Sequence, residues 1–192
     1  RLTGPAATVA LARGRYDGAH ALTDVEDLFV ADAATSGVSA GRMAFAPDGT
    51  ILLGIGAPSY LLAEGGTNRV GSVHDAQDPT SHAGKILRLA DDGSVPADNP
   101  FVMNAAYRRE IYALGIRNPT GLITHPTSGE PWIVDHGPLG GDEIDVIRAG
   151  ANYGWPLVSY GRAYSGRATR DGSGPLRARA WMPGMEEPLL FW

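Results

Sequence analysis

Short apolar runs separated by polar turns make up most of this sequence, and helical periodicity is scarce. Residues 7–18 alternate apolar and polar side chains and then reach an Asp-Gly pair, which is a hairpin turn signal. Residues 41–57 contain two apolar runs around a Pro-Asp-Gly turn, and residues 84–96 contain another run before an Asp-Gly turn. The pattern predicts strands in these three stretches, whereas residues 24–32 fit a strand or a short helix.

The second half of the chain continues this pattern. Residues 109–126 predict a strand, a loop and a second strand, and residues 127–137 predict a Pro- and Gly-bearing turn followed by an apolar strand. Pro47 and Pro126 occupy similar places in two such units, which indicates weak internal repetition. Repeated short strands with Gly-rich turns are typical of an all-β sandwich, barrel or propeller. The pattern alone favours none of the three.

One long polar stretch interrupts the strands between residues 57 and 83. A structureless loop of that length in a compact domain is usually either functional or disordered. The chain ends at Trp192 in what resembles the start of a strand, and it begins at Arg1 without Met or a signal-peptide pattern. We therefore expect a processed product or a piece of a longer protein.

Composition narrows the class of protein. The 192 residues are enough for one domain with a core, and 43% hydrophobic with 19% charged residues indicates a globular chain. The net charge of −5 argues against nucleic acid as a partner but leaves room for a small anion held by local arginines. The absence of cysteine excludes disulfides and thiolate metal sites. No apolar stretch approaches 18 residues, so we expect no membrane span.

A glycine-rich acidic segment follows the apolar run that ends near residue 135. It combines the pairs Gly137-Pro138 and Gly140-Gly141 with Asp142 and Glu143. One interpretation is a tight surface loop whose two acidic side chains are solvated. The other is a calcium site, because backbone carbonyls and carboxylates are the oxygen ligands that calcium takes. The regular spacing of the helix-loop-helix calcium motif is absent.

A second candidate is the loop at residues 115–122. Arg117 and Asn118 together can bind a planar anion through bidentate and amide hydrogen bonds. The alternative is that Arg117 is an ordinary surface arginine and that Asn118 begins a turn. The metalloprotease, P-loop, nucleophile-elbow and dinucleotide-binding motifs are all absent. Four histidines are better explained as solvated or structural than as catalytic: His74, His82, His125 and His136.

Taken together and in this order, several segments resemble the soluble quinoprotein sugar dehydrogenases, the glucose/sorbosone dehydrogenase family, and especially its aldose sugar dehydrogenase branch. The resemblance is strongest in residues 76–101, 111–122 and 135–156, and weaker in residues 9–18 and 41–56. It implies a six-bladed β-propeller of antiparallel four-stranded blades. Residues 1–192 would be part of this single domain and supply about three blades, without the N- and C-terminal ones.

The resemblance also implies a cofactor, pyrroloquinoline quinone (PQQ), with calcium. The backbone carbonyls of Gly137 and Pro138 match those that ligate the calcium in this family. His136 matches a position that contacts the cofactor. Arg117 and Asn118 match the pair that reaches the quinone oxygens.

Three further positions are interpreted through the resemblance. Glu143 and Tyr153 match positions where some members bind a further calcium, and residues 152–156 are expected to pack beneath the site. The family's catalytic base, a histidine, corresponds to Val38, and a valine side chain cannot accept a proton. His74 on the long polar loop is the substitute we consider, so the catalytic residue is unassigned.

The implied activity is oxidation of aldose sugars to lactones, with a sugar substrate and an electron acceptor as partners, in the periplasm or outside the cell. A homodimer is left open. The alternative is a non-catalytic propeller that keeps the fold, with or without the cofactor, as a binding protein. A structural propeller piece without a cofactor is the third hypothesis.

Overall fold

The computed structural model describes residues 2–3, 6–33, 39–57, 73–162 and 182–192. Its elements, in chain order, are β1 (Leu2–Thr3), β2 (Ala6–Ala7), β3 (Ala10–Tyr16), β4 (Leu22–Val30), β5 (Gly41–Phe45), β6 (Ile51–Ile55), the 3-10 helix η1 (Val73–Ala76), β7 (Lys85–Leu89), β8 (Ile111–Leu114), β9 (Pro119–Thr124), β10 (Pro131–Asp135), β11 (Glu143–Val146) and β12 (Leu190–Phe191). The described part of the chain is therefore all-β, with η1 as its one helical turn, as the sequence predicted. No helix in that part is both long and apolar enough to cross a membrane.

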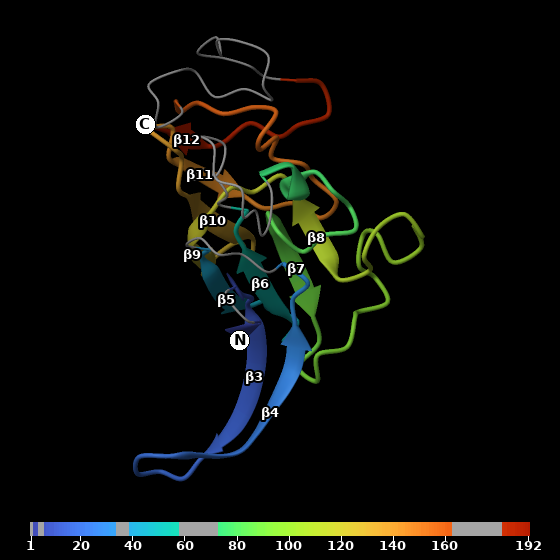
Figure 1. Ribbon diagram of the computed structural model, residues 1–192, viewed down its shortest axis with the longest axis vertical. Helices are drawn as coiled ribbons and strands as arrows, with labels where there is room; N and C mark the ends of the chain where they lie inside the picture. The colour runs from blue at the N-terminus through green and yellow to red at the C-terminus, as the bar shows by residue number, and fades with distance from the viewer. Residues whose placement is uncertain (1, 4–5, 34–38, 58–72, 163–181) are drawn as a thin grey trace.

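Two four-stranded antiparallel sheets form the body of the molecule (Figure 1). The first has the strand order β5-β6-β7-β8, and the second has the order β12-β11-β10-β9. In the first sheet, Gly49 and Gly93 are the glycines of the two predicted Asp-Gly turns, and each adopts a φ of +84°. Glycine adopts this left-handed conformation at little cost, so both predicted turns form where the sequence placed them.

A long hairpin of β3 and β4 extends away from the body (Figure 1). Its turn is held by the Asp17 carboxylate, which accepts the backbone N–H groups of Ala19, His20 and Ala21. The hairpin settles the ambiguity at residues 24–32, because this stretch lies mostly in strand β4.

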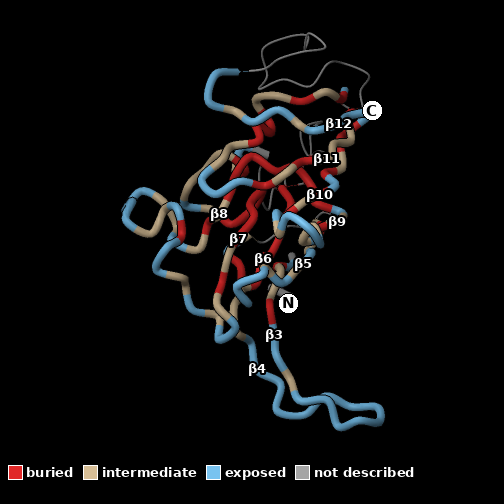
Figure 2. The backbone as a smooth tube through the Cα atoms, turned by 180° about the vertical axis from the view of Figure 1, so that it is seen from behind, coloured by how far each residue is buried: buried red, intermediate tan, exposed pale blue. Residues whose placement is uncertain are grey.

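The first sheet lies between the base of the hairpin and the second sheet, and strand β6 is buried along its whole length. Ile51, Leu53 and Ile55 face a cluster that includes Leu11 of the hairpin. Leu52 faces the opposite way, into a cluster shared with the second sheet. Burial on both faces explains why this strand has no polar alternation, and Figure 2 shows the buried centre.

Strands β5 and β9 lie side by side and run in the same direction. Arg42 Nε donates to the carbonyl of Thr120 at 2.7 Å, and Thr124 Oγ1 donates to the carbonyl of Phe45 at 2.7 Å. Strands β6 and β10 are antiparallel to β5 and β9, so they also run in the same direction. They therefore end at the same edge of the two sheets, at Ile55 and Asp135. This edge carries the candidate site.

The sequence analysis missed strand β11, which begins at Glu143. The interpretation of residues 137–143 as a surface loop with solvated acidic side chains is wrong for Glu143, which is partly buried in strand β11. The reason is the pairing of Glu143 with Asp135 across the sheet, which draws the end of the acidic segment into the second sheet.

Candidate functional site

The candidate site is built around Asp135, the last residue of β10. Its buried carboxylate accepts the backbone N–H of Arg117, at 2.7 Å, and the backbone N–H of Asn118. The loop between β8 and β9 is thereby fixed to the end of the neighbouring strand. Sequence analysis did not select Asp135, although an aspartate directly after a buried apolar run was a usable signal.

Gly115 opens this loop with a φ of +79°. A Cβ atom at this position would lie 2.3 Å from Asn152 Oδ1 and 2.6 Å from the backbone nitrogen of Gly154. Residues 152–156 therefore pack directly beneath the loop. The burial of Tyr153 and Trp155 agrees with the packing role expected for this segment.

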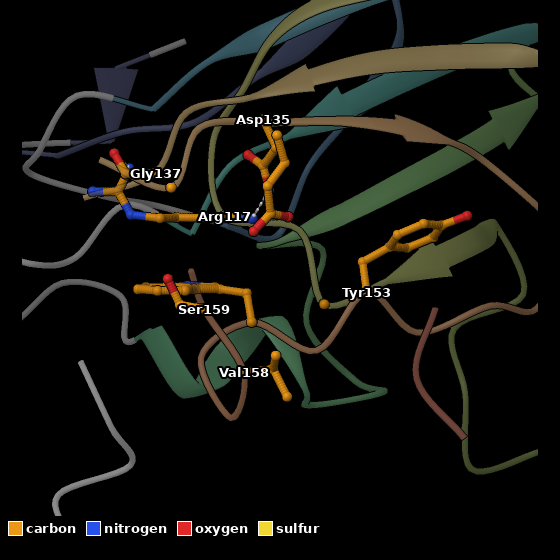
Figure 3. A pocket seen from close by; sticks show the side chains of 10 residues that line it. Arg117, Asp135, Gly137, Tyr153, Val158 and Ser159 are labelled. Carbon is orange, nitrogen blue, oxygen red and sulfur yellow. Dashed lines mark hydrogen bonds between the residues drawn. The ribbon is translucent and has the colours of Figure 1, made fainter. Parts of the chain in front are cut away.

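The Arg117 side chain is buried and extends toward the next loop (Figure 3). Its Nη1 donates to the backbone carbonyl of Gly137, at 3.0 Å, and to that of His136. The guanidinium carbon lies 5.4 Å from the centre of the Trp155 ring, within cation–π range. Two main-chain carbonyls thus converge on one positively charged group.

Asn118 is buried beside Arg117 but contacts the first sheet instead. Its Oδ1 accepts the backbone N–H of Ala40 at 2.8 Å. A Cβ on Gly56 would lie 2.5 Å from the same oxygen, so this close approach depends on glycine. Asn118 therefore connects the two sheets at the edge of the site.

The loop after β10 is closed by Asp142. Its Oδ1 accepts the backbone N–H of Gly137 at 2.9 Å, and its Oδ2 lies 3.1 Å from His136 Nδ1. A Cβ on Gly137 would lie 2.3 Å from the carbonyl oxygen of Gly141. The glycines are thus required for the close approach of the backbone to itself, and Asp142 holds the loop in this shape.

Three carboxyl groups gather at the base of the loop. Asp135, Glu143 and Asp145 each offer an oxygen atom within 4.8 Å of the other two. Asp145 is 1% exposed, and neither of its carboxylate oxygens has a hydrogen-bond partner. One cation with metal–oxygen distances of 2.3–2.6 Å could contact all three groups.

Burial raises the pKa of all three carboxyl groups. It raises the pKa of Asp135 to about 6, and burial together with the charge of Asp145 raises the pKa of Glu143 to about 9. Burial also raises the pKa of Asp145 well above its usual value. The cluster therefore favours either bound protons or a bound cation over three bare negative charges.

A small cavity lies beside Arg117 and two of these carboxyl groups, those of Asp135 and Glu143. Its lining includes Arg117, Asp135, Gly137, Glu143, Tyr153 and Trp155 (Figure 3). The Tyr153 ring points away from Arg117 in this view. The Tyr153 hydroxyl instead donates to the carbonyl of Val146 at 2.7 Å and accepts the backbone N–H of Arg148 at 2.9 Å. The Tyr153 side chain is therefore part of the packed framework beneath the site.

The structure brings together most residues selected from the sequence. Arg117, Gly137, Glu143 and Tyr153 line the cavity, and the others do not. His136 and Pro138 belong to the adjoining loop, and Asn118 flanks it. His74 is exposed on η1 and is not among the described residues that line the cavity, while Val38 lies outside the described residues.

Comparison with known proteins identifies a family and several relatives of this chain. The family model described as Glucose / Sorbosone dehydrogenase matches residues 2–192. Aldose sugar dehydrogenase YliI of Escherichia coli (strain K12) is 44% identical over 117 residues, which are 61% of this chain and 30% of the relative. Quinoprotein glucose dehydrogenase B of Acinetobacter calcoaceticus is 36% identical over 135 residues, which are 67% of this chain and 28% of the relative.

Solved structures agree with the sequence comparison. The PQQ-bound form of aldose sugar dehydrogenase from Streptomyces coelicolor superposes with a TM-score of 0.69 and 26% identity, covering 94% of this chain and 45% of that one. The chain spans less than half the length of each of these three relatives.

Proposed function

The chain belongs to the glucose/sorbosone dehydrogenase family, and we propose that it is part of a PQQ- and calcium-dependent enzyme that oxidises aldose sugars to lactones. One observation carries the proposal: a buried arginine that lines a small cavity at the edge of two sheets donates to two convergent backbone carbonyls, and one of them, that of Gly137, belongs to a residue lining the same cavity. Such a cavity can bind a cation and an anionic cofactor together.

We propose the six-bladed propeller on the same basis. Each four-stranded antiparallel sheet would be one blade, and β3 with β4 would belong to a third. Support comes from the face-to-face stacking of the sheets and from the parallel course of β5 and β9, since blades around a central axis repeat in this way. Residues 1–192 would then be one part of a single domain, completed by blades at both ends.

The residues present fit the proposed calcium. Calcium prefers oxygen ligands, and the Gly137 carbonyl already accepts a positively charged partner. The main-chain carbonyls of Gly137 and Pro138 would hold the ion. Gly137 and Gly141 permit the turn that presents them, and Asp142 stabilises it.

PQQ, when bound, would supply the electron acceptor for the hydride that leaves the sugar. Arg117 would bind an oxygen of the cofactor and stabilise negative charge there, which a buried guanidinium does well in a site of low dielectric constant. Asn118 keeps its amide oxygen on Ala40, so its NH₂ group is the part that would donate to the cofactor. His136, half-exposed beside the cavity, would contact the cofactor from the loop side.

The further calcium proposed at Glu143 and Tyr153 rests on different atoms. The carboxyl cluster supports Glu143, because Asp135 and Asp145 lie within reach of the same ion. The hydroxyl of Tyr153 is engaged with Val146 and Arg148, so only its main-chain carbonyl could serve.

The proton acceptor decides between two functions. Valine at position 38, where the family has its base, favours a second candidate: a non-catalytic propeller that binds the cofactor or a sugar. His74 is the substitute base that would preserve catalysis. A periplasmic or secreted location, a separate electron acceptor and a homodimer complete the proposal.

The deciding experiment uses the full-length protein loaded with PQQ and calcium, with quinone binding and aldose oxidation measured separately. We expect slow oxidation by the wild type and an increase of about 10²–10⁴-fold in Val38→His, which is the usual contribution of a general base. Val25→His, at a position 60% exposed on the hairpin, is the control and should leave the rate unchanged.

Two results would redirect the proposal. If the wild type oxidises aldoses at ordinary enzyme rates, another base operates, and His74→Ala tests which. If the quinone binds but neither the wild type nor Val38→His oxidises any aldose, the binding-protein function replaces the enzyme.

A further inference from the structure

The carbonyls of His136 and Gly137 already surround a positive charge. Both accept hydrogen bonds from Arg117 Nη1, and the guanidinium is covered on one side by the Trp155 ring. This pair of carbonyls, which we call the carbonyl seat, has the arrangement that proteins use to hold cations through main-chain oxygens.

Acidic groups near the carbonyl seat favour a cation there, because a cation offsets the negative charge that they carry when ionised. Asp135 and Glu143 line the same cavity, with Asp145 next to them. Among the described residues that line the cavity, Arg117 supplies the one positively charged side chain.

We propose that the Gly137 carbonyl, which belongs both to the carbonyl seat and to the proposed calcium site at Gly137 and Pro138, holds one cation at a time: the guanidinium of Arg117 before calcium binds, and calcium afterwards. This inference rests on the proposed role of the Gly137 carbonyl as a calcium ligand. Two cations cannot share one carbonyl at close range inside a protein without strong repulsion. Calcium must therefore displace Arg117 Nη1 from Gly137.

The exchange gives Arg117 a second role. Once displaced, its guanidinium becomes available to the oxygens of the cofactor, so calcium must bind before the arginine can contact the quinone. Calcium and quinone then bind cooperatively, because each favours the same displaced position of Arg117. Arg117 thus opposes calcium binding on its own and supports it when the cofactor is present.

The first test is calorimetry of calcium binding to the full-length protein without quinone. We expect Arg117→Gln to bind calcium roughly 10- to 100-fold more tightly than the wild type, because calcium no longer has to break charge-assisted hydrogen bonds. The control is Arg162→Gln, since exposed Arg162 is bound to the same loop through its backbone. Its calcium affinity should stay within about 2-fold of the wild type.

A second measurement follows the displacement in the wild type itself. Indole emission responds to a nearby charge, so calcium should shift the fluorescence of Trp155 as the guanidinium leaves its face. Trp155→Phe identifies the signal, and Arg117→Gln should bind calcium without it. An unchanged Trp155 emission in calcium-saturated wild type would overturn the exchange, whether or not Arg117→Gln folds.

The outcomes separate this inference from the proposed function. Equal or weaker calcium binding by Arg117→Gln means that Arg117 shapes the loop rather than competing for it, and the exchange is wrong while PQQ binding and sugar oxidation can still hold. Absence of calcium binding in both proteins, with and without quinone, overturns the exchange and the proposed calcium site together.

Discussion

Two buried ionisable side chains in this molecule, Lys85 and Asp145, differ in their hydrogen bonding. Lys85 is 0% exposed, and its ammonium donates to the carbonyls of Asp75, Ala76 and Ala83 at 2.6, 3.0 and 2.8 Å. Asp145 is buried as deeply, yet neither of its carboxylate oxygens has a partner. One charge has every hydrogen bond that it can make, and the other has none.

The difference separates framework from site. The three carbonyls around Lys85 attach η1 to strand β7, and nothing remains there for a ligand to satisfy. The cluster of Asp135, Glu143 and Asp145 places three carboxyl groups together beside a cavity, and Asp145 has no hydrogen-bond partner there. Natural structures leave few buried polar groups unsatisfied, and such groups mark functional positions more often than structural ones.

The largest expected effect comes from removing the satisfied charge. Lys85→Met should destabilise the protein by about 3 kcal/mol or more, because three buried carbonyls lose their donor at once. Urea unfolding of the full-length protein measures the change. Arg15→Met, at a side chain 81% exposed, should change the free energy of unfolding by no more than about 0.5 kcal/mol. Equal effects of the two changes would remove Lys85 from the framework.

The second prediction concerns the pH dependence of stability in chelator-treated protein. The folded-state pKa of Glu143 is raised to about 9, so the folded protein holds a proton that the unfolded chain releases above its ordinary pKa. Stability that is fully present below about pH 4.5 should therefore be lost as pH rises toward 9, with a slope of up to about 1.4 kcal/mol per pH unit for each proton released.

Glu143→Gln should reduce this slope, since the neutral amide cannot lose the proton, and Asp135 and Asp145 account for what remains. Glu130→Gln, on the exposed turn between β9 and β10, should leave the slope as it is. Thermal melts across the pH range provide the measurement. A slope in Glu143→Gln as steep as in the wild type would show that this carboxyl does not titrate in the folded protein.

The smallest effect is expected at the unsatisfied charge itself. Asp145→Asn keeps the shape of the side chain, removes a carboxyl group whose pKa burial has raised, and adds an N–H donor beside Asp135 and Glu143. The calcium-free protein should become more stable by about 1 kcal/mol near neutral pH. Asp91→Asn, at an exposed position in the turn after β7, is the matched control and should be neutral. A loss of stability in Asp145→Asn would mean that the aspartate already has a favourable interaction.

Local signals in the sequence were sufficient for most strands. The Pro-Asp-Gly turn between β5 and β6 and the Asp-Gly turn after β7 formed where they were predicted, because glycine at a positive φ and the apolar runs act within a few residues. Residues 24–32 stayed ambiguous until the pairing of β4 with β3 was known. Strand β11 was missed because its pairing with β10 and its burial come from a distant part of the chain.

The candidate site also contains residues that the sequence predicted and residues that only the structure revealed. The order of the motifs pointed to Arg117, Gly137 and Glu143, and the structure places all three around one cavity. Asp135 and Asp145 escaped notice, because whether a carboxylate is solvated or buried depends on what the rest of the fold packs over it.

The sequence by itself determined the antiparallel all-β class, the turns and the motifs by which the family is recognised. Each of these depends on residues that are close together in the chain. Only the tertiary structure decided that Arg117 reaches the carbonyls of His136 and Gly137, and that Lys85 is satisfied while Asp145 is not. The physical reason is that hydrogen-bond partners and desolvation are properties of neighbours in space. The sequence alone does not say which atoms those neighbours will be.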